Sequence, residues 1–263
     1  MNRRSIPVFT SLIVLFMLAC NATFTFGNPT PPVEPPTQVP TATLVPLSAQ
    51  VTLVSQPYIE SNQEPAFTIT AQTPQLSGSD DPRVLAFNQK LHDLVQGEVD
   101  VFRQEFMNAP LVEVAAGSFL EITHTLAAQY DDIWSFKFVF FFYSNGAAHP
   151  GDYSMTLNYD LEQGRELALG ELFLPGSGYL EEISKYCIAE LGEQPFFDGP
   201  FTTGTEPTAE NYRNWNITPE GLMITFDTYQ VAPGAAGPQV VVVPYGQLSA
   251  LINPQGPLAG FIQ

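Results

Sequence analysis

Residues 133–144 read IWSFKFVFFFYS, and their pattern indicates which structural layers must cover this segment. Successive side chains of a β-strand point to opposite faces, so a period of two is typical of a strand. Every second position from 136 to 142 is phenylalanine, and the positions between them also include aromatic residues. Because both faces are apolar, we expect a central strand that is covered on each side.

A long amphipathic helix can cover one of these faces. From Val84 to Met107, apolar residues recur three or four positions apart, which is the spacing of one helical face. The preceding GSDDP at 78–82 provides an acidic N-cap and a proline in the first turn. We therefore expect a helix over 84–107 that packs on the strand at 133–144.

The remaining apolar segments predict strands joined by hairpins, with shorter helices between groups of strands. Asp131-Asp132 marks the turn between strands at 118–130 and 133–144. Further strands are expected at 51–58, 66–71, 153–160, 215–218, 222–226 and 239–243. Shorter helices are expected at 177–191 and 245–252. This order predicts an α+β fold, in which the long helix and the shorter helices pack on an antiparallel sheet.

The first twenty residues have the pattern of an export signal. Arg3 and Arg4 precede an apolar run from Ile6 to Ala19, which is shorter than the ~20 residues that span a bilayer. MLAC at 17–20 resembles a bacterial lipobox, whose cysteine is diacylated and becomes the new N-terminus. We expect a lipoprotein signal peptide at 1–19, a lipid on Cys20, and an extracytoplasmic protein anchored to a membrane. An ordinary secretory signal that contains a cysteine is the alternative.

A segment rich in proline and threonine follows. Residues 28–46 read NPTPPVEPPTQVPTATLVP, and proline favours the extended polyproline II conformation of a semi-rigid spacer. We assign 20–50 to the lipidated cysteine and its linker, and 51–263 to one α+β body. A body of this length can bury a sizeable core.

The chain is strongly acidic. It has 9 Lys and Arg against 27 Asp and Glu, a net charge of −18, and loss of Arg3 and Arg4 with the signal leaves 7 − 27 = −20. Such a surface repels nucleic acid and speeds the encounter with a basic partner. We expect no binding to nucleic acid.

The two cysteines do not predict a disulfide. The lipobox uses Cys20, which leaves Cys187 alone. Cys187 lies on the apolar face of the helix expected at 177–191. We expect it to be a small buried residue rather than a nucleophile.

His149 is the best candidate for a functional side chain. It lies in a loop that contains Gly146, between two expected strands, and it precedes Pro150. An imidazole titrates near neutral pH, so it can act as an acid or base or bind a metal. The alternatives are binding of a ligand and a structural role, in which His149 bonds the loop backbone.

A second conspicuous loop is APGAAGP at 232–238. Gly234 and Gly237 leave room for the close approach of a partner, and Tyr229 and Tyr245 flank the loop. Tyrosine is favoured in interfaces because it offers a large contact area at a low entropic cost. The alternative is a hairpin connection whose tyrosines pack on the sheet.

Acidic pairs raise the question of glycoside hydrolysis, which uses two carboxyl groups. The pairs are Asp80-Asp81, Asp131-Asp132 and Glu181-Glu182. A helix cap, a turn and the first turn of a helix explain them. None has the spacing of a calcium-binding loop. We expect no catalytic residue set, no metal and no cofactor, although the question of enzymatic activity stays open.

Several short motifs occur in an order typical of a known family. They are YSNGAAHP at 143–150, NYDL at 158–161, GLMITF at 221–226, YQVAPGAAGP at 229–238 and VPY at 243–245. Together they resemble the RsiV-type extracytoplasmic domain of lysozyme-sensing anti-sigma factors. A related region, here called PdaC-type, accompanies the catalytic domain of certain peptidoglycan deacetylases. On this resemblance, 51–130 forms a PdaC-like half and 131–252 an RsiV-like half.

The resemblance implies binding rather than catalysis. RsiV-type domains bind lysozyme, whereas the chemistry of PdaC-type enzymes belongs to a separate metal-dependent domain for which we see no room here. Few residues precede Ile6, so we expect no segment that binds a sigma factor. We expect a lipid-anchored binding or sensor domain of the cell envelope, for a basic lysozyme-like protein or for peptidoglycan. The alternative is a peptidoglycan-modifying enzyme of the deacetylase type, or its accessory subunit.

Overall fold

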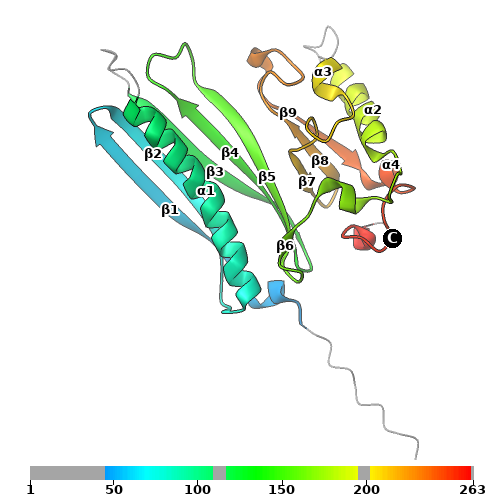
Figure 1. Ribbon diagram of the computed structural model, residues 1–263. Coiled ribbons are helices and arrows are strands. Elements are labelled where there is room, and N and C mark those ends of the chain that lie inside the picture. The colour runs from blue at the N-terminus through cyan, green and yellow to red at the C-terminus, as the bar shows by residue number, and fades with distance from the viewer. Residues whose placement is uncertain (1–44, 109–116, 195–201, 262–263) are drawn as a thin grey trace, which may run out of the picture. The chain divides into compact units, whose positions relative to one another are not determined.

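Two β-sheets, each packed against a helix, organise this chain (Figure 1). The structure is a computed structural model, and it describes residues 45–108, 117–194 and 202–261. These ranges belong to a unit that runs from Leu44 to Gln263. The α+β class expected from the sequence is confirmed.

The larger sheet has six strands in the order β1-β2-β3-β4-β5-β6. Their bounds are Thr52–Gln63, Ala66–Ser77, Ser118–Tyr130, Ile133–Tyr143, Gly151–Asp160 and Arg165–Glu166. Neighbouring strands are antiparallel except β2 and β3, which pair in parallel from Phe67–Ser118 to Ala71–Ile122. The sequence did not predict this pair. It arises because the chain crosses over through a helix between the two strands.

That crossover is helix α1, Pro82–Asn108, which lies along one face of the larger sheet (Figure 1). Its ring of Phe87 lies 6.1 Å from that of Phe136, and its Phe102 ring lies 4.9 Å from that of Phe142. Strand β4 has β3 on one side and β5 on the other. The predicted central strand and its helical cover are therefore both confirmed.

The smaller sheet has three antiparallel strands in the order β7-β8-β9. They span Trp215–Ile217, Gly221–Phe226 and Gln239–Pro244. Helix α2, Tyr179–Gly192, packs against this sheet, and its Cys187 is fully buried in the second core, as expected. The short elements are α3 Thr202–Thr205, α4 Tyr245–Leu248, η1 Leu47–Gln50, η2 Leu169–Leu172, η3 Gly234–Ala236 and η4 Ala259–Phe261.

A buried polar cluster joins the two sheets. The Ser135 hydroxyl of β4 donates to Oδ1 of Asn158 at 2.7 Å and accepts a bond of 2.9 Å from Nδ2 of Asn216 in β7. Ser135 and Asn216 are fully buried, and Asn158 is 3% exposed. The face of β4 opposite α1 is therefore covered by the second sheet around Ser135, whereas Phe141 on the same face is 40% exposed. Hydrogen bonds between specific partners fix the arrangement of the two layers.

The first folded residues lie in the segment expected to be linker. The Asp132 carboxylate accepts hydrogen bonds from the backbone N–H groups of Leu47 and Ser48, at 3.2 and 2.7 Å. The predicted signal peptide at 1–19 and Cys20 lie outside the described residues. None of the described helices is both long enough and apolar enough to cross a membrane.

Candidate functional site

An open cavity of about 430 Å³ lies where β4 ends, β5 begins and the chain leaves β8. Segments far apart in the sequence meet there. The residues that line it are Phe142, His149, Pro150, Gly151, Asp152, Tyr153, Thr228, Tyr229, Gly234 and Ala235. The cavity thus combines aromatic rings with a carboxylate, a hydroxyl group and an imidazole.

Tyr229 is the most exposed large aromatic side chain at this cavity, with 60% of its surface accessible. Its φ angle of 71° lies in the left-handed region, which costs energy for a residue other than glycine. Its ring packs against Gly234, where a Cβ atom would come within 2.2 Å of Tyr229 Cζ. The surrounding structure therefore holds the backbone of Tyr229 in an unfavourable conformation, with its ring exposed to solvent.

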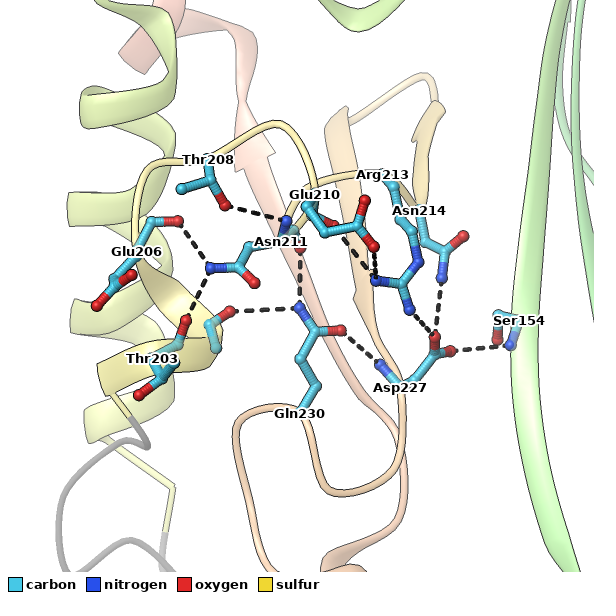
Figure 2. Close-up of polar contacts among 11 residues, drawn as sticks. Ser154, Thr203, Glu206, Thr208, Glu210, Asn211, Arg213, Asn214, Asp227 and Gln230 are labelled. Atoms are coloured by element: carbon cyan, nitrogen blue, oxygen red, sulfur yellow. Dashed lines mark hydrogen bonds and ion pairs between the residues drawn. The ribbon is translucent and has the colours of Figure 1, made fainter.

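Tyr229 belongs to the turn Asp227–Gln230, which is closed by a bond of 2.9 Å from Gln230 N to Asp227 O. Figure 2 shows how the Asp227 carboxylate holds the first end of this turn. Its Oδ1 accepts the backbone N–H of Ser154 at 2.8 Å, and its Oδ2 accepts Arg213 Nη2 at 2.9 Å and Asn214 Nδ2 at 3.2 Å. Because Ser154 lies in β5, this carboxylate also ties the smaller sheet to the larger one.

Gln230 holds the other end of the turn (Figure 2). Its Oε1 accepts the backbone N–H of Asp227 at 3.1 Å, and its Nε2 donates to the carbonyl oxygen atoms of Asn211 at 2.9 Å and Gly204 at 3.3 Å. With both ends fixed, the turn presents Tyr229 with little conformational freedom. Such preorganisation reduces the entropic cost of binding.

Three polar side chains line the cavity beside Tyr229. The Thr228 hydroxyl donates to both carboxylate oxygen atoms of Asp152, at 3.0 and 3.1 Å. The exposed His149 donates from Nδ1 to the carbonyl oxygen of Pro150 at 2.8 Å, which leaves Nε2 as the second polar atom of the ring. The bond to Pro150 is the loop contact expected of His149 in a structural role.

The structure brings together three of the five residues predicted to bind a ligand. His149, Tyr229 and Gly234 all line the cavity. Gly237 lies beyond it, with a φ angle of 67° and its carbonyl oxygen bonded to the Gln239 side chain. Tyr245 is buried, and its hydroxyl donates to Thr218 O at 2.8 Å.

Asp152 and Thr228 are cavity residues that the sequence did not reveal. Asp152 lies three positions after His149, at the start of β5, and Thr228 directly precedes Tyr229. The sequence indicated Asp152 and Thr228 no more strongly than as polar residues next to the motifs in the two loops. Nothing in the sequence indicated that the loops meet, because they are separated by more than seventy positions in the chain.

Thr228 is paired with a carboxylate rather than with an imidazole. A nucleophilic hydroxyl group normally donates to an imidazole base, whereas the Thr228 hydroxyl donates to the Asp152 carboxylate. No group of three or more His, Cys, Asp or Glu residues within the described ranges is arranged to hold a metal ion. Hydroxyl, carboxylate and imidazole groups beside an aromatic ring can bind a polar ligand that has an apolar face.

Fold and cavity together define an α+β protein with an open site suited to a small polar ligand. Residues 170–246 match the family described as "Protein of unknown function (DUF3298)", so the chain contains a DUF3298 domain. This domain includes α2, the smaller sheet, and the Tyr229 and Gly234 walls of the cavity.

Two characterised proteins are similar to part of the chain. One is the peptidoglycan-N-acetylmuramic acid deacetylase PdaC of Bacillus subtilis (strain 168), 29% identical over 113 residues, which are 42% of this chain and 24% of PdaC. The other is the esterase Rv3036c of Mycobacterium tuberculosis (strain ATCC 25618 / H37Rv), 28% identical over 111 residues, which are 42% of this chain and 49% of the esterase. The similarity thus spans less than half of either protein. The predicted relationship to PdaC is confirmed, and the relationship to RsiV-type domains stays a prediction.

Two crystal structures share the fold. A DUF3298-family protein from Bacteroides fragilis NCTC 9343 superimposes with a TM-score of 0.57 and 16% identity, over 81% of this chain and 97% of that one. A second, from Pseudomonas aeruginosa PAO1, has a TM-score of 0.52 and 14% identity, over 78% and 94% of the two chains. The α+β arrangement described above therefore occurs in other DUF3298 proteins.

Proposed function

We propose that this protein is a lipid-anchored binding module of the bacterial cell envelope, and that its cavity binds the glycan of peptidoglycan. The observation that carries the proposal is Tyr229, an exposed ring held in a left-handed conformation beside Asp152, Thr228 and His149. A sugar ring offers C–H groups to an aromatic face and hydroxyl groups to polar side chains. The similarity to PdaC, a peptidoglycan deacetylase, supports this choice of ligand.

The lipid anchor is a separate part of the proposal. It rests on the MLAC motif at 17–20 behind two arginines and a short apolar run. Cells grown with an alkyne-labelled fatty acid should yield labelled protein, and Cys20→Ala should abolish the label and release the protein from the membrane fraction. An unlabelled wild-type protein would contradict lipidation and leave the glycan proposal standing.

Co-sedimentation with purified, insoluble peptidoglycan tests the binding function. We expect Tyr229→Ala to weaken binding about tenfold, which corresponds to ~1.4 kcal/mol. Tyr229→Phe keeps the ring and should retain most of the affinity. The matched control is Leu85→Ala, which removes an exposed apolar side chain from α1. Equal binding by wild type and Tyr229→Ala would refute the role of the cavity.

A basic lysozyme-like protein is the competing ligand, and the net charge of −18 favours it. Titration with lysozyme at low and high salt separates the two, because screening weakens association between exposed charges. Binding of lysozyme that is lost in high salt and unaffected by Tyr229→Ala would favour the protein partner. Release of acetate from peptidoglycan would instead favour an enzyme. The similarity to the deacetylase PdaC and to an esterase is the reason to test for it.

A further inference from the structure

A second hollow of about 240 Å³ lies between α1 and the β1–β2 hairpin, and it shares no lining residue with the cavity at Tyr229. We call it the amide groove. Its lining consists of Gln56, Pro57, Tyr58, Thr73, Pro74, Gln75, Asn88, His92 and Gln96. Asn88, His92 and Gln96 are four positions apart in α1, so they form one row along the helix.

The chemistry of the groove is neutral, although the chain is strongly acidic. Four of its side chains carry a primary amide, and none of its residues is an aspartate, glutamate, lysine or arginine. A primary amide both donates and accepts hydrogen bonds, so it matches a hydroxyl or an acetamido group. Gln56 is exposed and Gln75 is half-buried, so both amides can contact a ligand in the groove.

An ion cluster behind the groove fixes two of its walls. Arg103 donates from Nη2 to the Tyr58 hydroxyl at 2.7 Å and from Nε and Nη2 to the Glu60 carboxylate at 2.7–3.0 Å. Arg103 also pairs with Asp100, whose Oδ1 accepts Nε2 of Gln96 at 2.8 Å. The same guanidinium group therefore positions the Tyr58 ring and the Gln96 amide.

The hairpin wall is also held in place. Asn88 donates to Leu76 O and accepts from Leu76 N, both at 2.8 Å, which clamps β2 to α1. Pro57 and Pro74 add rigid apolar rings to the lining. The groove thus has a fixed framework of two amides and three rings, to which the more exposed glutamine side chains are added, and a volume of about 240 Å³. That volume is comparable to one hexose ring.

We propose that the amide groove is a second carbohydrate site, which binds one ring of a neutral N-acetylhexosamine polymer. With the cavity at Tyr229 it would make the chain bivalent, so that binding to a long glycan exceeds the affinity of either site. The amide groove does not depend on the function proposed for the cavity, because it uses different residues and a different part of the fold.

The test uses the full-length protein and a soluble tetramer of β-1,4-linked N-acetylglucosamine, titrated by calorimetry. Wild type and the Tyr229→Ala variant are both titrated, and the groove is tested in the Tyr229→Ala background, which removes the contribution of the cavity. We expect saturable binding of one tetramer, and at least a tenfold loss of affinity when Gln56→Ala and Gln75→Ala are added. The control is Gln104→Ala, an exposed glutamine of α1 outside the groove.

Two results would overturn the second site: no saturable binding in the Tyr229→Ala background, or unchanged affinity after the two glutamine substitutions. Far-ultraviolet circular dichroism confirms that the variants are folded. If the tetramer binds wild type and the Tyr229→Ala variant equally, and the glutamine variant loses it, the amide groove stands and the cavity proposal fails. Each of the two proposals can therefore be refuted without refuting the other.

Discussion

The ring of Tyr229 occupies the space that a side chain at Gly234 would need. A Cβ atom on residue 234 would lie 2.2 Å from Cζ and 2.4 Å from the hydroxyl oxygen of Tyr229. Real atoms do not approach so closely, so a larger residue at this position would push the Tyr229 ring away. The exposed ring and the small residue form one structural unit.

Gly234→Ala should therefore displace Tyr229 and weaken binding to peptidoglycan about as much as Tyr229→Ala does. Because the clashing atoms are the far end of an exposed side chain, we expect little change in the free energy of unfolding, measured in urea. Gly246→Ala is the matched control, because its Cβ would meet nothing within 4 Å. Unchanged binding by Gly234→Ala would show that the position of the ring is unimportant.

Asp227→Ala should destabilise the protein more than a surface substitution does. Its side chain is 13% exposed, and removing it leaves Ser154 N–H and Asn214 Nδ2 without their acceptor. A buried group left unsatisfied costs about 1–3 kcal/mol, so we expect a loss of about 2–4 kcal/mol in urea unfolding. Asp93→Ala removes a carboxylate that is 65% exposed and should change little. If Asp227→Ala and Asp93→Ala destabilised the protein equally, the Asp227 carboxylate would not be holding the two sheets together.

Cys187 should resist alkylation in the folded protein. Burial raises the pKa of its thiol to about 12, so the reactive thiolate is scarce at pH 8. Iodoacetamide should modify it only after unfolding, which peptide mass spectrometry can follow across a urea series. Rapid modification in the absence of urea would show that α2 opens readily.

Lys137→Met should stabilise the protein at neutral pH. Burial lowers the pKa of Lys137, an effect that the charge of Asp227 partly offsets. A base whose pKa is lower in the folded state makes the wild type less stable while it is protonated. That cost falls as pH rises from the folded-state pKa toward ~10.4, the value in the unfolded chain. The advantage of the variant in thermal unfolding should therefore shrink between pH 7 and pH 10, and a variant less stable at pH 7 would contradict this.

Local patterns predicted the elements of this fold well. The alternation around Phe136 predicted a strand at 133–144, and β4 spans Ile133–Tyr143. The three- and four-residue spacing after Val84 predicted a helix over 84–107, and α1 spans Pro82–Asn108. In both cases one face of the element is buried, so the pattern of apolar residues records the geometry directly.

Pairings between distant segments could not be predicted in this way. Strands β2 and β3 are separated by α1, and no local pattern states that they run in parallel. The division into two sheets depends on Ser135 and Asn216, which meet across the layers as buried polar residues. For the same reason the sequence indicated His149 and Tyr229 separately but did not reveal Asp152, whose role follows from the contact between two loops.

The single parallel pair has a consequence for local opening of the chain. Strand β2 pairs with β1 along its whole length, but with β3 only over Phe67–Ala71 in the described part of the chain. Its outer half, 72–77, is held to the rest by fewer bonds, such as those of Asn88 to Leu76. Amide protons there should exchange with solvent sooner than those of β4, because this stretch is not paired with β3. A ligand that bridges the hairpin and α1 would slow that exchange.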